Sequence, residues 1–166
     1  MSSSRGSGET GRASSSEVLV LDACVVAKWV LPGEPWEGEA LELKERVARG
    51  EVEAHEPALL VYELASLLSR AASEGRISLG DASLAVELLG RVGLTLHGVD
   101  WSDGTKLLRV ASELGLTVYD AAYVALAEEL SATLVTADEE LCRRARVRVA
   151  ARHLRDVGRG LPPAGR

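Results

Sequence analysis

The sequence predicts one α/β domain in which helices cover both faces of a central, mostly parallel sheet of four or five strands. Short, continuous apolar runs alternate with longer segments in which apolar residues recur at helical spacing, a pattern typical of a three-layer sandwich. The chain has 166 residues, of which 46% are hydrophobic and 27% are charged. That length supports one sizeable core and is short for a two-domain enzyme.

The first half of the domain is expected to contain one strand and three helices. Val18 to Leu21 is wholly apolar and predicts a buried strand. Apolar residues at helical spacing then predict one helix over 36–47 and a second over 60–71. Ser78 with Asp81 indicates the capped start of a third helix. The inward positions of this third helix are expected at Leu84, Ala85, Leu88, Leu89 and Val92.

The second half is expected to continue the alternation of strands and helices. Leu94 to Leu96 predicts a strand, and Ser102 is expected to cap the helix that follows it. Every residue from Ala121 to Ala127 is apolar or aromatic, so protein must surround this next helix on most sides. The remaining elements are expected to be a buried strand at 133–136, a short helix at 138–144 and an edge strand at 146–150.

Composition also limits the class of protein. Residues 1–16 and 158–166 are expected to be flexible tails rich in small or turn-forming residues, which leaves 17–157 as the folded domain. No stretch approaches the roughly 20 apolar residues of a membrane span, so no membrane role is expected. Cys24 and Cys142 lack metal-ligand spacing, and the default expectation is a reducing, cytoplasmic location.

Charge is distributed unevenly along the chain. The net charge is -6, yet residues 141–166 contain eight Arg and one Asp. Clustered arginines supply non-specific affinity for nucleic-acid phosphates, which makes Arg143, Arg144 and Arg146 candidate phosphate contacts. The alternative is a solvated surface that offsets the acidic body, and charge alone does not distinguish the two.

Four carboxylates lie where burial makes a charge costly. Asp22 ends the first apolar strand and Asp138 follows a later one, so both lie at the carboxyl ends of strands. Glu63 borders the buried stripe of its helix, and Asp120 directly precedes the wholly apolar helix. Taken singly, each has an ordinary explanation, which is an N-cap for the aspartates and a salt bridge or a rim position for Glu63.

Together these acids predict a divalent cation site. A parallel sheet brings strand ends to one edge, where clustered carboxylates repel one another unless a cation holds them. Mg2+ and Mn2+ prefer such oxygen ligands, and metal-bound water hydrolyses phosphodiesters. None of the histidines adjoins the four acids in sequence, which argues against zinc. His97 is expected in a strand, and His55 and His153 are expected at the surface.

Four segments of the chain match motifs of a known family. They are VLVLDACVVAKWVLPGE, PALLVYELASLL, LGLTVYDAAYVALAEEL and LVTADEEL, and each contains one of the four acids. The third is the most specific, because it joins Asp120 to the buried helix. On these segments the chain resembles PIN-domain proteins, in particular the VapC-type ribonuclease toxins of toxin–antitoxin pairs, over about residues 18–157.

The resemblance implies a ligand set and partners. It implies that Asp22, Glu63, Asp120 and Asp138 surround Mg2+ or Mn2+, with Thr136 as a polar helper beside the last acid. It also implies a homodimer and a small antitoxin protein whose C-terminal segment fills the active-site groove, often presenting an Arg to the acids. The groove candidates are Trp29, Leu31, Trp36 and Tyr62, for each of which core packing is the alternative.

One position departs from the family pattern. Cys24 stands where the family often has Ser or Thr, and a thiol is a poorer hydrogen-bond donor. Lower activity or an altered metal preference is expected, while Cys24 itself is expected to be a small buried hydrophobe and not a nucleophile.

The sequence therefore predicts a Mg2+- or Mn2+-dependent ribonuclease that acts on RNA as the toxin of a VapBC-type pair. The alternative is a PIN-like module that no longer cleaves and instead binds RNA or protein. An aspartyl phosphatase fits poorly, because it would need an acid at position 24. A phospho-accepting receiver fits poorly as well, because it would need a late lysine, and the last lysine in the chain is Lys106.

Overall fold

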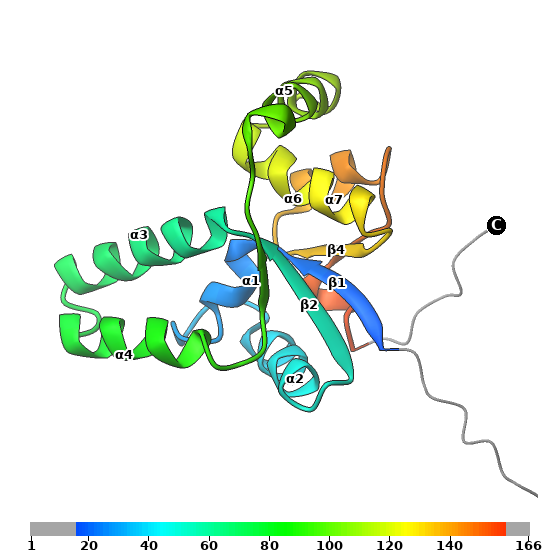
Figure 1. Ribbon diagram of the computed structural model, residues 1–166. Helices are drawn as coiled ribbons and strands as arrows, with labels where there is room; N and C mark the ends of the chain where they lie inside the picture. The colour runs from blue at the N-terminus through cyan, green and yellow to red at the C-terminus, as the bar shows by residue number, and fades with distance from the viewer. Residues whose placement is uncertain (1–15, 159–166) are drawn as a thin grey trace, which may run out of the picture.

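The computed structural model describes residues 16–158, which contain a sheet of five parallel strands in the order β3-β2-β1-β4-β5 (Figure 1). The most central strand, β1, is the apolar run that the sequence predicts, and its last three residues are buried. The strands are β1 (Glu17–Leu21), β2 (Val52–Pro57), β3 (Thr95–His97), β4 (Thr133–Thr136) and β5 (Ala151–His153).

Helices cover both faces of the sheet and confirm the three-layer prediction. The chain adds strands in one direction from β1 to β3 and then returns past β1 to β4 and β5. Right-handed crossovers therefore place α1 to α4 on one face and α5 to α7 on the other, as Figure 1 shows. The helices are α1 (Ala23–Ala27), α2 (Glu37–Ala48), α3 (Leu59–Ser73), α4 (Leu79–Leu89), α5 (Trp101–Leu114), α6 (Val118–Glu129) and α7 (Glu139–Ala145), with a 3-10 turn, η1, at Leu154–Asp156.

The core lies against β1 and α6. Helix α6 packs on β1, β2 and β4, and α5 packs on α6. Tyr123, Val124 and Ala127 of α6 are fully buried, which confirms that protein surrounds this helix on most sides. In contrast, α3 and α4 form a hairpin that projects from the sheet (Figure 1).

The structure corrects two strand predictions. The sequence analysis missed β2, because Glu53, His55 and Glu56 interrupt its apolar residues. The strand expected at 146–150 is also wrong. Helix α7 is followed there by a turn in which the amides of Arg148 and Val149 donate to the carbonyl of Ala145, and β5 begins only at residue 151.

Helix ends and faces differ in detail from the predictions. Asp100, not Ser102, caps α5, and its capping box with Asp103 explains the earlier start. Leu84 and Leu88 are 53% and 52% exposed, so the prediction that they face inward is wrong. They lie on the projecting hairpin, where less protein covers the outer face of α4.

Residues 1–15 and 159–166, which make up nearly all of the two expected tails, lie outside the described residues. None of the helices that the structure describes has the length and hydrophobicity needed to cross a bilayer.

Candidate functional site

Asp22 lies at the point where the strand order reverses, between β1 and β4, where open parallel sheets bind their ligands. It occupies the N-cap position of α1, but its side chain makes no capping hydrogen bond in the described structure. Its Oδ2 instead accepts bonds from the hydroxyl of Thr136 (2.7 Å) and the thiol of Cys24 (2.9 Å). The carboxylate is 8% exposed and held by groups from two segments, so an N-cap role does not explain it.

Glu63 and Asp120 come from helices on opposite faces of the sheet. Glu63 lies on α3 and is half-buried, and its carboxylate accepts a hydrogen bond from the hydroxyl of Tyr123 on α6. Asp120 is the third residue of α6, and Thr117 is the N-cap, so the N-cap explanation of Asp120 is wrong. Asp120 and Tyr123 are three residues apart, which puts them on the same side of α6.

The electrostatics show that three of the acids lie near one another. Burial raises the pKa of Asp22, and the negative charge of Asp120 raises it further against the two hydrogen bonds that lower it. Burial also raises the pKa of Glu63, opposed by the Tyr123 bond and reinforced by the charges of Asp22 and Asp120. A cation placed among them would relieve this repulsion.

Asp138 is exposed and joins the group indirectly. Its Oδ1 caps α7 by accepting from the amides of Glu140 (2.8 Å) and Leu141 (2.9 Å), so its N-cap explanation holds. Its own amide donates to the hydroxyl of Thr136 (3.0 Å), which in turn donates to Asp22. Thr136 is thus the link between the two aspartates, and its side chain is fully buried.

The donor chemistry fits a divalent cation, although the side chains do not form a closed cage. Within residues 16–158 no group of three His, Cys, Asp or Glu side chains is arranged to hold a metal ion as it stands. Mg2+ commonly binds through one or two carboxylates and keeps several waters. Asp22 with Asp120 or Glu63 would provide such a partial ligand set.

Sequence reasoning missed a further acid, Glu56 of β2. Its carboxyl is fully buried, and Oε1 accepts a hydrogen bond from the amide of Leu21 (3.1 Å), while Oε2 has no partner in the described structure. Burial raises its pKa well above the usual value, and the nearby charge of Asp22 adds to the rise. Glu56 stands between His55 and Pro57 in VEAHEP, so no apolar run marks it in the sequence, and it is identified as a buried acid only once β2 is recognised.

Cys24 touches the site, contrary to the expectation of a plain buried hydrophobe. Its thiol donates to Asp22 and accepts from the amide of Ala137 (3.3 Å), which ties α1 to the loop after β4. Burial raises the pKa of Cys24 to about 12, and the adjacent Asp22 charge contributes, so the group is a neutral thiol.

His153 supports the same loop from β5. It is buried, so the expectation that it lies at the surface is wrong. Its Nδ1 accepts from the amide of Arg155, which leaves Nε2 to donate to the carbonyl of Ala137 (3.0 Å). His97 lies in β3 as expected and contacts His55 (2.9 Å between ring nitrogens), which is half-buried in β2.

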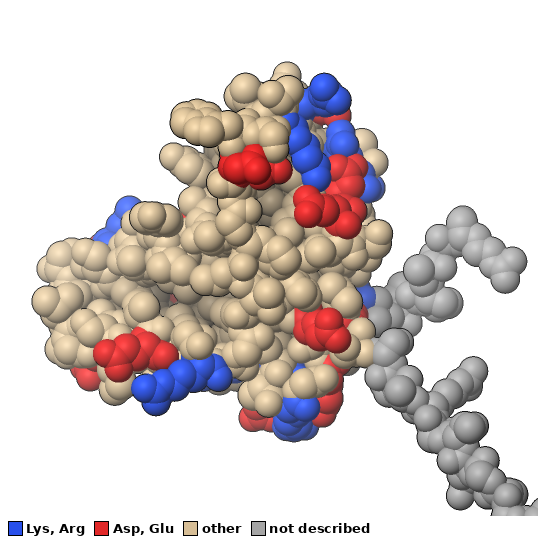
Figure 2. Space-filling view, viewed as in Figure 1, with Lys and Arg blue, Asp and Glu red and all other residues tan. Residues whose placement is uncertain are grey.

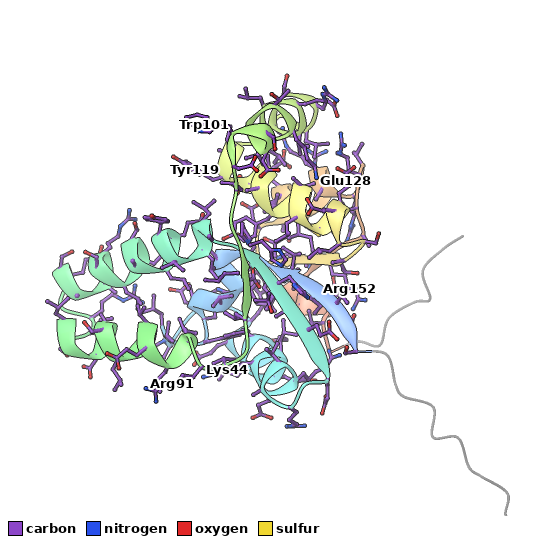
Figure 3. All side chains as sticks on the ribbon, viewed as in Figure 1. Lys44, Arg91, Trp101, Tyr119, Glu128 and Arg152 are labelled. Atoms are coloured by element: carbon purple, nitrogen blue, oxygen red, sulfur yellow. The ribbon has the colours of Figure 1, made fainter. Side chains whose placement is uncertain are left out.

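A cleft of about 530 Å³ opens over Asp22 and Glu63, and we call it the acidic cleft. Of the four groove candidates only Tyr62 lines it, whereas Trp29 and Leu31 are buried and Trp36 packs edge-on against His153. Tyr119 also lines the cleft, and Figure 3 shows it pointing to the same side as Trp101. The lining residues are Asp22, Ala23, Cys24, Leu59, Tyr62, Glu63, Ser66, Leu67 and Tyr119.

The arginines that were candidate phosphate contacts all have partners within the protein. Arg143 and Arg144 bind Glu140 at 2.7 and 2.6 Å, whereas Nε of Arg146 donates to the carbonyl of Ala151 (3.1 Å). Arg144 also donates to the carbonyls of Leu114 and Gly115. The pairs with Glu140 favour the role of a charge-balancing surface for Arg143 and Arg144.

The sheet is parallel and has Asp22 at the carboxyl end of its central strand, and a family model described as PIN domain matches residues 19–147. The chain belongs to the PIN domain family. It is 34% identical over 127 residues to Ribonuclease VapC3 of Pyrobaculum aerophilum, covering 76% of this chain and 93% of the relative. It is 38% identical over 89 residues to Ribonuclease VapC9 of Mycobacterium tuberculosis, covering 52% and 66%.

Solved structures agree on the fold. The crystal structure of PAE2754 from Pyrobaculum aerophilum superposes with a TM-score of 0.63 at 26% identity, covering 89% of this chain and 95% of that one. VapBC2 from Rickettsia felis, bound to a DNA fragment from their promoter, superposes with a TM-score of 0.60 at 15% identity, covering 82% and 98%. At 15% identity, the similarity to VapBC2 shows a shared fold and nothing more.

Proposed function

We propose that the protein is a Mg2+- or Mn2+-dependent ribonuclease that hydrolyses RNA phosphodiester bonds. The observation that carries the proposal is that Asp22 and Glu63 line one cleft, with Asp120 close enough for its charge to raise the pKa of both. The identity to Ribonuclease VapC3 over nearly all of that relative's length supports RNA as the substrate.

The protein's own residues would hold the metal and orient the reaction. Asp22 is fixed by Thr136 and Cys24, and Glu63 is fixed by Tyr123, so neither carboxylate has to be ordered when metal binds. Asp138 would contribute Oδ2, the oxygen that its cap of α7 does not use. The metal would lower the pKa of a bound water and stabilise the charge that grows on the phosphate oxygens.

We also propose that the protein is the toxin of a toxin–antitoxin pair and acts in the cytoplasm as a homodimer. An apolar groove of about 210 Å³ runs between α3, α4 and β3, lined by Val61, Val86 and Leu96 among others. Figure 2 shows that charged side chains on this face lie mainly at its edges. Such a groove fits a protein segment, while the exposed Val99 and Trp101 provide an apolar surface for a second copy.

The test is cleavage of a labelled single-stranded RNA by the wild type and by Asp120→Asn, each with Mg2+, Mn2+ or EDTA. We expect cutting that needs both the metal and Asp120, with Asp22→Asn equally inactive and both variants folded. Wild-type activity in either variant would overturn the assignment. No cutting together with no metal binding would favour a catalytically silent RNA-binding or protein-binding module.

A further inference from the structure

A second cleft, of about 360 Å³, adjoins the acidic cleft, and three cations outnumber two glutamates, Glu34 and Glu74, in its lining. Cys24 and Leu67 line both clefts, so they form a common boundary. Beyond this boundary the cations are Lys28, Arg70 and Arg76. We call this second cleft the basic cleft.

Helix α3 is the wall that the two clefts share. Glu63, Leu67, Arg70 and Glu74 follow one another at spacings of three or four residues, so they form one stripe along α3 and its C-cap. Seven residues separate Glu63 from Arg70, a rise of about 10 Å along the axis. An extended polymer strand lying along this stripe would contact the carboxylate of Glu63 at one point and the guanidinium of Arg70 about 10 Å further on.

The cations of the basic cleft are weakly neutralised by protein. Nζ of Lys28, a residue that is only 7% exposed, lies 4.0 Å from Glu34, and a guanidinium nitrogen of Arg76 lies 3.6 Å from the same carboxylate. Both distances exceed a hydrogen bond, and one acid serves two cations. Arg70 forms no ion pair within residues 16–158.

Most other cations of the described chain are committed more firmly. Arg46, Arg143, Arg144, Arg148 and Arg152 each bind a glutamate within 3.1 Å. Lys44, Arg91, Arg109 and Arg146 resemble Arg70 in forming no ion pair with the described residues, but they line neither the acidic nor the basic cleft. Figure 3 shows Lys44 and Arg91 at the lower side of the molecule, on α2 and just after α4.

We infer that the basic cleft binds a backbone phosphate of the RNA strand whose neighbouring phosphodiester lies in the acidic cleft, with Arg70 as its principal contact and with Arg76 and Lys28 beside it. The inference rests on the proposed ribonuclease function. Arginine binds phosphate through paired N–H groups, and a phosphate here would replace the distant Glu34 as the partner of Arg76. Contacts of this kind set affinity and register for any sequence, while the metal site performs the cleavage.

Binding can be measured apart from cleavage. The full-length wild type, Arg70→Gln, Glu34→Gln and the control Arg91→Gln are titrated, in EDTA, into a fluorescent 12-nucleotide single-stranded RNA over a range of salt concentrations. We expect Arg70→Gln to weaken binding about three- to tenfold and to reduce the salt slope by about 0.7, the value for one lost phosphate contact. Glu34→Gln should tighten binding, because it removes the competing carboxylate, and Arg91→Gln should match the wild type.

The outcomes separate this inference from the proposed function. Equal affinities and salt slopes for Arg70→Gln, Arg91→Gln and wild type would overturn the basic cleft as a phosphate site, even if the wild type cleaves RNA with metal. Loss of affinity in Arg70→Gln would support the site, even if no cleavage were seen. If Arg70→Gln left RNA binding intact but weakened binding of a hexaglutamate peptide, the inference would be overturned and the cleft assigned to an acidic protein segment.

Discussion

The hydroxyl of Tyr123 donates a hydrogen bond to the carboxylate of Glu63. Tyr123 is fully buried in α6, the helix at the centre of one layer, whereas Glu63 lies on α3, part of the projecting hairpin. The bond therefore fixes an acid of a peripheral helix to the buried core. Helix α6 positions two of the acids, because it carries Asp120 and its Tyr123 binds Glu63.

Tyr123→Phe tests this connection. Removing the hydroxyl should lower the free energy of unfolding by about 1 kcal/mol. It should also raise the pKa of Glu63 further, because the Tyr123 bond opposes the effect of burial. The acid limb of the cleavage profile should then move to higher pH, measured as initial rate against pH. Tyr119→Phe, a tyrosine that lines the acidic cleft without bonding Glu63, is the control, and an unchanged acid limb in Tyr123→Phe would contradict the argument.

Thr136 should be needed for both stability and activity. Thr136→Val keeps the shape of the side chain but removes the donor to Asp22 and the acceptor for the amide of Asp138. We expect a loss of about 1–3 kcal/mol in urea unfolding and at least a tenfold fall in cleavage. Thr136→Ser retains the hydroxyl and should recover most of both. If the valine variant matched the serine variant, the hydroxyl would have no such role.

Glu56 should make the protein less stable as the pH rises. Its folded-state pKa lies well above its unfolded value of about 4.5, so its contribution to stability is fully present below pH 4.5 and declines as the pH increases. Glu56→Gln stays neutral and can still accept from Leu21. It should raise the melting temperature at pH 8 by about 3 °C or more and flatten the decline between pH 5 and pH 8.

The exposed Glu87→Gln is the matched control for Glu56→Gln, and it should leave the melting curve unchanged at both pH values. Asp22 and Glu63 also have raised pKa values, so a weaker decline should persist in Glu56→Gln. An equally steep decline in Glu56→Gln and wild type would show that Glu56 is not the source.

Gly115 should be less tolerant of substitution than Gly50. Both have positive φ, +63° and +73°, so alanine at either position costs about 1 kcal/mol of backbone strain. A Cβ at Gly50 meets nothing within 4 Å, whereas at Gly115 it would overlap the guanidinium of Arg144, which donates to the carbonyls of Leu114 and Gly115. Gly115→Ala should therefore cost about 1 kcal/mol more than Gly50→Ala in chemical denaturation. In an Arg144→Ala background the two costs should become equal, and a persisting difference would remove Arg144 as the cause.

The sheet could be predicted wherever a strand is an unbroken apolar run, as in Val18 to Leu21 and 133–136. It could not be predicted at β2, where a fully buried Glu56 interrupts the pattern and only the pairing with β1 shows that the segment is central. The prediction of which face of α4 is buried was wrong for the opposite reason. Leu84 and Leu88 have the spacing of core residues but lie on a hairpin that leaves them exposed.

The acids could be located because strand ends and helix starts are visible in the sequence. Two of their partners lie far away in the sequence: Thr136 reaches Asp22 across 114 positions and Tyr123 reaches Glu63 across 60. Thr136 was expected only as a helper beside Asp138, and Cys24, two positions from Asp22, was expected to be a plain hydrophobe. The clustering of arginines in the sequence did not reveal which groups they bind in the structure. Arg143 and Arg144 bind Glu140 at the local i,i+3 and i,i+4 spacings of α7, but the pair between Arg148 and Glu128 joins positions that are far apart in the sequence.

The position of β1 determines when the site can exist during synthesis. Leu19 pairs with Ala54 on one side and with Thr133 on the other, and the carboxylate of Asp22 accepts a hydrogen bond from the hydroxyl of Thr136. A ribosome must therefore translate more than three-quarters of the chain before Asp22 has its neighbours. The nascent protein passes through the exit tunnel with its acids unassembled, and the message being read is not exposed to a finished site until the last strands pair.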